Sequence, residues 1–218
     1  MNYIANVIGA TGLVGNKLTL LLLENPDFKL VRIFTRRKTG IIHQKLEEQI
    51  IDFRKPGKWE HLVEGDILFS ALGTTLKQAG SKENEYEVDF TFNLNFAKAA
   101  HKNKVPRYIL VSSVGANPKS RVFYSRMKGE LEDEIARLSF ENLVIFRPSV
   151  LAGQRTEKRP MEVLAVKIGR FLTKFIFRKY KPVNGETVAK AMISSVLNPD
   201  KKKVLIVELD EIFSLAGE

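Results

Sequence analysis

The segment Gly9-Ala-Thr-Gly-Leu-Val-Gly15 constrains the fold of this chain more than any other feature. It follows an apolar run at residues 2–8 that predicts a buried strand, and it opens a helical pattern at residues 13–24. A glycine-rich turn between a strand and a helix can cradle a dinucleotide, because the glycines allow a tight turn and a close pyrophosphate while the helix N-terminus attracts the anion. The spacing is G-x-x-G-x-x-G, and a turn without a ligand is the alternative. We expect nucleotide contacts from Gly9, Thr11, Gly12, Leu13, Val14 and Gly15.

The rest of the chain alternates short apolar runs with helical patterns. The apolar runs predict strands at residues 2–8, 29–35, 49–53, 66–71, 107–112, 142–147 and 203–207. Apolar residues at helical spacing predict helices at residues 13–24, 82–103, 123–138, 161–179 and 185–197. This alternation indicates an α/β protein with helices on both faces of a parallel sheet, and right-handed connections favour the doubly wound order of a Rossmann fold.

The length of 218 residues is enough for one sizeable core. We therefore expect residues 1–218 to form a single NAD(P)-binding Rossmann domain. Residues from about 148–182 are expected to add a small C-terminal lobe on the substrate side, with a polar loop at 153–160 and a basic helix at 161–179. That helix is expected to pack over the substrate cleft, and contact with an anionic surface is the alternative.

The end of the second predicted strand indicates which dinucleotide binds. Proteins that bind NAD place an acidic residue there for the ribose 2′-hydroxyl. This chain has Thr35-Arg-Arg-Lys38 instead, with no Asp or Glu between Lys29 and Gly40. Because arginine suits a 2′-phosphate through bidentate hydrogen bonds, Arg36 and Arg37 favour NADP(H) over NAD(H). An exposed basic turn without a ligand is the alternative.

Two later strand ends fit the same site. Asp52 and Phe53 end the third predicted strand, where an adenine ring would lie. The fourth ends at Ala71, Leu72 and Gly73, where small residues let a ribose and phosphates approach the backbone. Ligands of such sheets bind beyond the carboxyl ends of the strands. Each segment could equally be an ordinary junction between a strand and a turn.

A candidate proton relay follows the fifth predicted strand. Ser112 and Ser113 end this strand, and Tyr124 and Lys128 lie on one face of the next helix because they are four residues apart. The ordinary pKa of tyrosine is about 10, and a neighbouring ammonium group lowers it. A serine hydroxyl could hold a substrate carbonyl while Tyr124 passes a proton to its oxygen, and Lys128 could also bind the nicotinamide ribose. Alone, the pair is also typical of a helix surface, and the serines could cap the helix.

In combination, these motifs resemble the short-chain dehydrogenase/reductase superfamily. More narrowly, five segments are similar to its atypical branch related to the Tat-interacting-protein oxidoreductases: residues 71–81, Val88-Asp89, and residues 111–116, 124–130 and 145–149. The likeness runs in order over roughly residues 2–160. It implies a Rossmann fold, NADP(H) binding and a catalytic set of Ser113, Tyr124 and Lys128, with Ser113 matching the motif better than Ser112.

The resemblance also assigns the turn after the sixth strand. Arg147-Pro-Ser149 matches a turn that lies beside the nicotinamide, which implies a cofactor contact from Pro148. The asparagine of the superfamily's usual tetrad has no clear counterpart, and Asn93 and Asn95 are the candidates. The predicted function is hydride transfer between NADP(H) and a carbonyl or alcohol substrate. The alternative is a non-enzymatic NADPH sensor or scaffold, because some members of the branch bind NADPH in regulation.

Composition limits the remaining classes of function. The chain has no cysteine, which excludes disulfides and thiolate chemistry, and its three histidines show no metal-ligand spacing, so no metal is expected. The net charge of +10 is spread along the chain and suits a polyanionic cofactor better than nucleic acid. The apolar run Leu18 to Leu23 is too short to span a bilayer, and the N-terminus does not read as a signal peptide, so we expect a cytoplasmic protein without an integral membrane segment. The substrate and the oligomeric state are not indicated.

Overall fold

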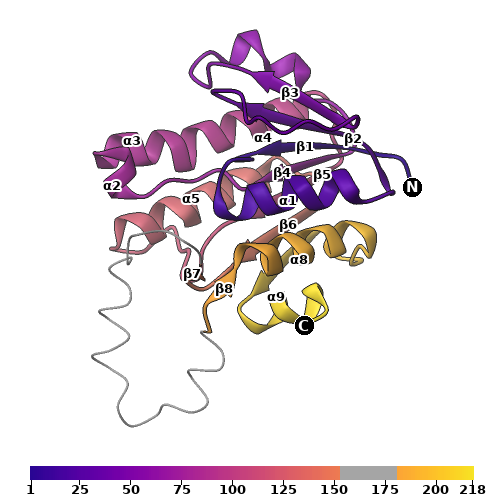
Figure 1. The fold of residues 1–218 in the computed structure, drawn as a ribbon. Coiled ribbons are helices and arrows are strands. Elements are labelled where there is room, and N and C mark those ends of the chain that lie inside the picture. Colours follow the sequence, from indigo (N-terminus) through magenta and orange to yellow (C-terminus); the bar gives the residue numbers. More distant parts are fainter. Residues whose placement is uncertain (153–180) are drawn as a thin grey trace.

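The computed structural model describes residues 1–152 and 181–218 and confirms the predicted α/β class. Seven strands form one parallel sheet in the order β3-β2-β1-β4-β5-β6-β9 (Figure 1). The chain winds outward in two directions from the neighbouring strands β1 and β4, which is the arrangement of a doubly wound Rossmann sheet. The strands are β1 (Tyr3–Ile8), β2 (Phe28–Thr35), β3 (Leu46–Ile50), β4 (Ile67–Ser70), β5 (Arg107–Val111), β6 (Asn142–Arg147) and β9 (Val204–Glu208).

Helices cover both faces of this sheet (Figure 1). On one face lie α1 (Leu13–Glu24), α8 (Gly185–Leu197) and α9 (Asp210–Ala216). On the other face lie α4 (Asn93–Lys102) and α5 (Phe123–Arg137). The shorter elements are two 3₁₀ turns (Pro56–Lys58 and Glu60–Leu62), α2 (Leu76–Ala79), α3 (Lys82–Tyr86) and a π-helical turn (Glu87–Phe92).

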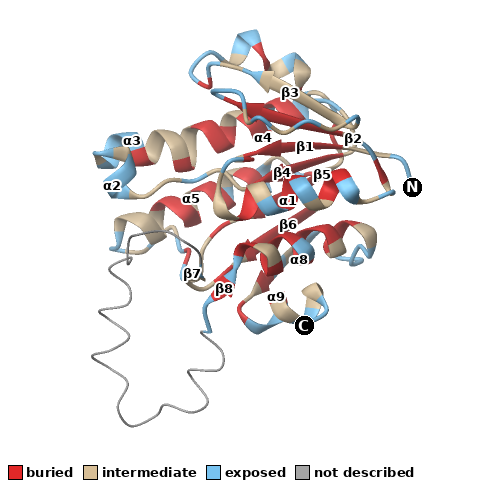
Figure 2. Ribbon diagram, in the orientation of Figure 1, coloured by how far each residue is buried: buried red, intermediate tan, exposed pale blue. Residues whose placement is uncertain are grey.

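The inner strands of the sheet read as largely apolar runs because both faces of the sheet are buried there. Neighbouring residues point to opposite faces: Val7 packs with α1 and α8, whereas Ile8 packs with α4 and α5. In β4, Phe69 faces the side of α1 and α8, and Leu68 faces the side of α4 and α5. Figure 2 shows the result, with buried strands in the middle and exposed positions on the outer sides of the helices. This pattern is the one expected of a parallel sheet with two helical layers.

The third predicted strand was placed wrongly. The structure has β3 at Leu46–Ile50, and Asp52 and Phe53 lie in the turn after it. β3 is the edge strand of the sheet, and its sequence Leu-Glu-Glu-Gln-Ile is only half-buried or exposed. Only residues 51–53 of the run that we used for the prediction lie in the turn after β3, and these three line the cleft described below.

The single helix predicted at residues 82–103 is broken. It consists of α3, the π-helical turn and α4, in direct succession. The buried side-chain amide of Asn93 donates hydrogen bonds to the carbonyls of Val88 and Asp89, at 3.0 and 3.1 Å. Because a π-helical turn disturbs the regular hydrogen bonding of a helix, these two bonds stabilise the wider turn, and such turns are frequent at functional sites.

The C-terminal part of the described chain completes the main sheet. β9 pairs with β6, and the short strands β7 (Leu151–Ala152) and β8 (Val183–Asn184) form a separate two-stranded sheet. The loop expected at 153–160, the basic helix expected at 161–179 and most of the lobe expected at 148–182 lie outside the described residues. Among the helices in the described ranges, none is long and apolar enough to cross a membrane.

Candidate nucleotide-binding and active site

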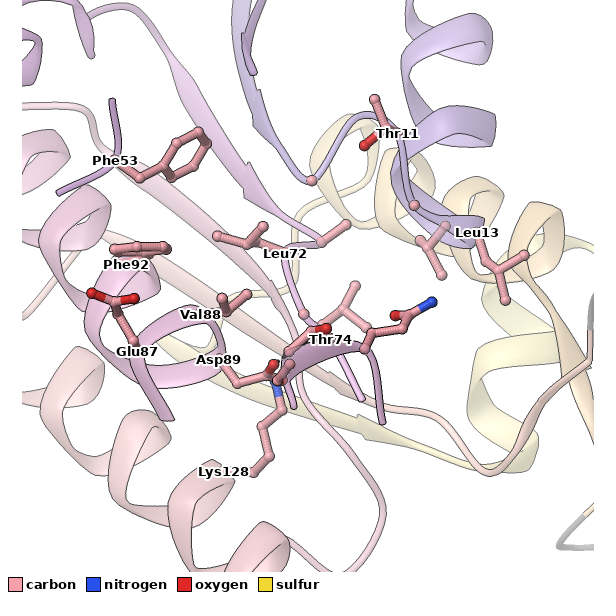
Figure 3. A pocket seen from close by; sticks show the side chains of 18 of the residues that line it. Thr11, Leu13, Phe53, Leu72, Thr74, Glu87, Val88, Asp89, Phe92 and Lys128 are labelled. Carbon is pink, nitrogen blue, oxygen red and sulfur yellow. Dashed lines mark hydrogen bonds and ion pairs between the residues drawn. The ribbon is translucent and has the colours of Figure 1, made fainter. Parts of the chain in front are cut away.

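A cleft of about 860 Å³ lies beyond the carboxyl ends of the strands, where β1 and β4 lead the chain in opposite directions. This is where doubly wound sheets bind their ligands. Figure 3 shows side chains from several elements turned toward it. All of the site residues predicted from the sequence line this cleft except Gly15 and Arg37; those that do are Gly9, Thr11, Gly12, Leu13, Val14, Arg36, Asp52, Phe53, Ala71, Leu72, Gly73, Ser113, Tyr124, Lys128 and Pro148.

The glycine-rich loop can have no side chain at its two ends. Gly9 has φ +82°, and a Cβ atom there would lie 2.4 Å from the carbonyl oxygen of Ala71. A Cβ atom on Gly15 would lie 2.1 Å from the carbonyl oxygen of Gly9. Gly15 therefore packs α1 against the loop and does not face the cleft. Gly12 is the N-cap of α1 and has no side chain that could accept hydrogen bonds from the first-turn amides. These amides can therefore bind a phosphate. The loop fits a pyrophosphate.

The two arginines after β2 differ in position. Arg36 lines the cleft and is exposed, so its guanidinium can meet a ligand. Arg37 is also exposed but is not among the residues that line the cleft. Of the two, Arg36 is the better placed for a ribose 2′-phosphate.

The β3 side of the cleft has apolar walls and a charged rim. The ring centroids of Phe53 and Phe92 lie 5.5 Å apart with the ring planes inclined by 48°, and together they form an apolar wall that an adenine ring could contact. Arg54 and Glu87, which the sequence did not indicate, form a two-point ion pair at the same end, with N···O distances of 2.7 and 3.0 Å. The Asp52 carboxylate accepts a hydrogen bond from the Arg54 backbone N–H, which lowers the pKa of Asp52.

The two serines after β5 have different surroundings. The Ser112 hydroxyl is buried and donates to the carboxylate of Glu132. Glu132 also forms an ion pair with Arg147 at 2.5 Å and thereby raises the pKa of that guanidinium. Among the described residues, the Ser113 hydroxyl has one hydrogen bond, a long one of 3.4 Å that it donates to the Val114 carbonyl. This arrangement leaves Ser113 as the serine better placed to bind a substrate oxygen.

Lys128 is held by a buried ion pair that the sequence did not reveal. Its Nζ lies 2.9 Å from Oδ1 of Asp89, and the two side chains are 3% and 1% exposed. The other Asp89 oxygen accepts the backbone N–H of Thr74 at 2.7 Å, so Asp89 joins the loop after β4 to α5. Lys128 also lies 5.8 Å from the ring centroid of Tyr124. Figure 3 shows Asp89, Thr74 and Lys128 together at the floor of the cleft.

Neither asparagine proposed for the fourth tetrad position lines the cleft. The amide of Asn93 is engaged by the carbonyls of the π-helical turn and by that of Leu72. Asn95 is half-buried and also absent from the lining residues. Asp89, one helical turn before Asn93, is the residue of this helix that contacts Lys128. In the sequence, Asp89 stood out as an acidic residue beside the apolar Val88 and as part of the Val88-Asp89 segment of the family resemblance, but neither signal indicated an ion pair with Lys128.

Within residues 1–152 and 181–218, no three His, Cys, Asp or Glu side chains come together as a metal site would require.

The sheet order, glycine loop and cleft define a Rossmann fold. A UDP-N-acetylglucosamine 4-epimerase from Methanobrevibacter ruminantium has the same fold, with a TM-score of 0.69 and 17% identity over 98% of this chain and 80% of that one. The Bordetella bronchiseptica enzyme WbmH, solved with NAD+, gives a TM-score of 0.62 and 17% identity over 94% and 86% of the two chains. At this identity the likeness concerns the fold alone.

The chain belongs to the HIM1 family, whose profile matches residues 27–181. It is 35% identical to "Protein FMP52, mitochondrial" of Candida albicans over 97% of both chains. It is 33% identical to the protein of the same name in Saccharomyces cerevisiae, over 97% of this chain and 95% of the relative.

These names show that the expectation of a cytoplasmic protein was wrong, because the relatives are described as mitochondrial. The expectation rested on the lack of a bilayer-spanning apolar run and of a secretory signal. Neither property distinguishes the cytoplasm from the interior of a mitochondrion.

Proposed function

We propose that the protein is an NADP(H)-dependent oxidoreductase that transfers a hydride between the cofactor and a carbonyl or alcohol substrate. One observation carries this proposal: a single cleft contains the glycine loop, Arg36 and the set Ser113, Tyr124 and Lys128. A nucleotide cradle and a proton relay in one cleft are what a dinucleotide-dependent oxidoreductase requires.

The residues along the cleft suit the parts of NADP(H) in order. Phe53 and Phe92 would contact the adenine, and Arg36 would bind the ribose 2′-phosphate. The loop from Gly9 to Gly12 would bind the pyrophosphate, and Pro148 would contact the nicotinamide. NADP(H), when bound, supplies or accepts the hydride.

The protein's own contribution would be to orient the substrate and to move one proton. The Ser113 hydroxyl would donate a hydrogen bond to the substrate carbonyl oxygen. Tyr124 would deliver its hydroxyl proton to the same oxygen during reduction, and it would recover a proton from solvent or, in the reverse reaction, from the alcohol. Lys128, held by Asp89, would contribute to the position and the electrostatic environment of Tyr124.

We also propose a narrower relationship and a location. Within the dehydrogenase/reductase fold, the motifs at residues 71–81 and 111–116 favour the branch of the Tat-interacting-protein oxidoreductases. The mitochondrial relatives favour a mitochondrial protein. Fractionation of cells that express a tagged form would test the location, and recovery of the tag outside the mitochondrial fraction would contradict it.

A non-enzymatic NADPH sensor is the second candidate, and the Asp89–Lys128 pair favours it. The carboxylate balances the charge of the ammonium at 2.9 Å. A relay that depends on a net positive charge beside Tyr124 would be weakened by this arrangement. A sensor would bind NADPH without oxidising it in the presence of any carbonyl compound.

Replacement of Tyr124 by phenylalanine tests the proposed reaction. NADPH oxidation would be followed by absorbance with a panel of aldehydes, ketones and quinones. We expect Tyr124→Phe to lower kcat by about 10²–10⁴-fold while NADPH binding stays unchanged, because only the proton donor is lost. Tyr86→Phe is the matched control, since Tyr86 lies outside the cleft lining. Full activity of Tyr124→Phe would contradict the relay, and NADPH binding without turnover by the wild type would favour the sensor.

A further inference from the structure

The ion pair between Arg54 and Glu87 lies at the rim of the cleft, on the side of β3. Arg54 belongs to the turn after β3, and Glu87 begins the π-helical turn, so the pair joins two elements that face each other at this end. Both nitrogens of the contact, Nε and Nη2, meet the two carboxylate oxygens at 3.0 and 2.7 Å. The Arg54 backbone is fixed by its hydrogen bond to Asp52. Figure 3 places Glu87 beside Phe92 and Phe53, away from Thr11 and Leu13 of the glycine loop.

Another anion can replace Glu87 as the partner of Arg54 with little loss of free energy. The Arg54 side chain is 66% exposed and that of Glu87 is 32% exposed. Ion pairs as exposed as this one contribute little to stability, because water and salt screen them. A phosphate offers the same planar guanidinium two acceptor oxygens and up to twice the negative charge of a carboxylate.

The position of Arg54 in the sheet indicates which phosphate of the cofactor it could bind. In the strand order β3-β2-β1-β4, Arg54 follows β3, and Arg36 follows the neighbouring strand β2. The glycine loop, where the pyrophosphate would bind, follows β1 and is one strand further away. A phosphate between Arg36 and Arg54 therefore belongs to the adenosine end of the ligand.

We propose that Arg54 is a specificity-determining residue that binds the adenosine ribose 2′-phosphate together with Arg36, and that Glu87 competes with this phosphate for Arg54. The inference rests on the proposed use of NADP(H). In the free protein Glu87 occupies the guanidinium. In the complex the phosphate replaces Glu87, and a ligand without this phosphate leaves the ion pair in place. Arg54 thus discriminates NADP(H) from NAD(H). Glu87 lowers the net affinity for the phosphate, because the phosphate must displace its carboxylate from Arg54.

The two partners of the pair should therefore have opposite effects on binding. Dissociation constants for NADPH and NADH would be measured by calorimetry on the full chain. We expect Arg54→Gln to weaken NADPH binding by about tenfold, the loss of one charge-assisted contact, and to change NADH binding by less than about twofold. Glu87→Gln should strengthen NADPH binding by about threefold, because the competing carboxylate is gone.

A second ion pair on the surface provides the matched control. Lys102 and Glu60 lie 2.7 Å apart, with side chains that are 66% and 35% exposed, and neither lines the cleft. Lys102→Gln and Glu60→Gln should leave both dissociation constants unchanged. Adenosine 2′,5′-bisphosphate and adenosine 3′,5′-bisphosphate serve as probes for the position of the phosphate. We expect only the 2′,5′ compound to lose affinity with Arg54→Gln.

The possible failures are distinguishable. If the wild type binds NADPH no better than NADH, or binds neither, the proposed cofactor and this inference both fail. If NADPH is preferred but Arg54→Gln has no effect, the proposed function stands and this inference is wrong. Equal weakening by Arg54→Gln and Glu87→Gln would show a structural ion pair and would overturn the competition. Selective loss of the 3′,5′ compound would assign Arg54 to a different nucleotide and would overturn it as well.

Discussion

At the scale of single residues, Asp89 determines the surroundings of Lys128. Both side chains are buried, and Asp89 also binds the Thr74 backbone N–H. A Cβ atom on Gly73 would lie 3.0 Å from the Asp89 carboxylate, so the loop after β4 is fitted closely around this group. The pair is therefore part of the floor of the cleft as well as a neighbour of Tyr124.

Replacing one member of this ion pair should lower the free energy of unfolding more than replacing both. Asp89→Asn or Lys128→Met removes one member of a buried ion pair, and we expect each to lower the free energy of unfolding by about 3–5 kcal/mol. The double variant should recover part of this loss. Urea denaturation measures all three. Glu186→Gln, which removes an exposed partner of Lys190, is the control and should leave the free energy of unfolding nearly unchanged. Equal stability of Asp89→Asn and the wild type would refute the role of the pair.

The sequence predicted much of the site at this scale but not its partners. The spacing of Tyr124 and Lys128 on one helix is local and can be read directly from the chain. Asp89 lies in a different helix and reaches Lys128 only through the folding of the sheet. The ion pair of Arg54 with Glu87 is missing from the prediction for the same reason. Long-range pairs of this kind leave no periodic signal in one sequence.

At the scale of elements, the edge strand β3 shows where the hydrophobic pattern of the sequence does not predict a strand correctly. Periodicity locates buried strands well, and β1, β5 and β6 differ from their predicted ranges by a residue or less. β3 is instead held by pairing with β2 and by Arg32, a buried residue of β2. Arg32 binds the carboxylate of Glu47 at 2.8 Å. A polar strand fixed by a cross-strand ion pair does not appear as an apolar run.

The contribution of Glu47 to stability should disappear in acid. Its hydrogen bond from Arg32 lowers the pKa of Glu47 below the ordinary 4.5 of the unfolded chain. A lowered pKa means that the stabilisation is complete above pH 4.5 and is lost as the pH falls through the folded-state pKa. We expect Glu47→Gln to be less stable than the wild type at neutral pH, by up to about 1 kcal/mol for this half-exposed group. The difference should vanish in acid.

Urea denaturation at a series of pH values measures this difference. Glu24→Gln, at the exposed end of α1, is the control and should not reproduce the pH dependence. A difference between Glu47→Gln and the wild type that stays constant from neutral to acidic pH would contradict the role of ionised Glu47.

At the scale of the whole molecule, an early and a late helix, α1 and α8, meet next to the glycine loop. α8 packs on the same face of the sheet as α1, and its first residue, Gly185, lies against the start of α1. A Cβ atom on Gly185 would lie 2.4 Å from the carbonyl oxygen of Leu13, a residue that lines the cleft. The alternation of elements predicted the Rossmann topology. It did not predict this contact, because the closeness of Gly185 to Leu13 depends on how α8 docks.

Replacement of Gly185 by alanine should therefore disturb the nucleotide site from outside it. The added methyl group must displace the backbone at Leu13, and we expect a loss of about 1–3 kcal/mol in stability together with weaker NADPH binding. For a chain of this size each kcal/mol lowers Tm by about 2–4 °C, which thermal denaturation resolves. Gly57→Ala is the matched control, since a Cβ atom there meets nothing within 4 Å. A Gly185→Ala protein with the Tm and NADPH affinity of the wild type would show that α8 does not support the loop. A lowered Tm with unchanged affinity would limit its role to stability.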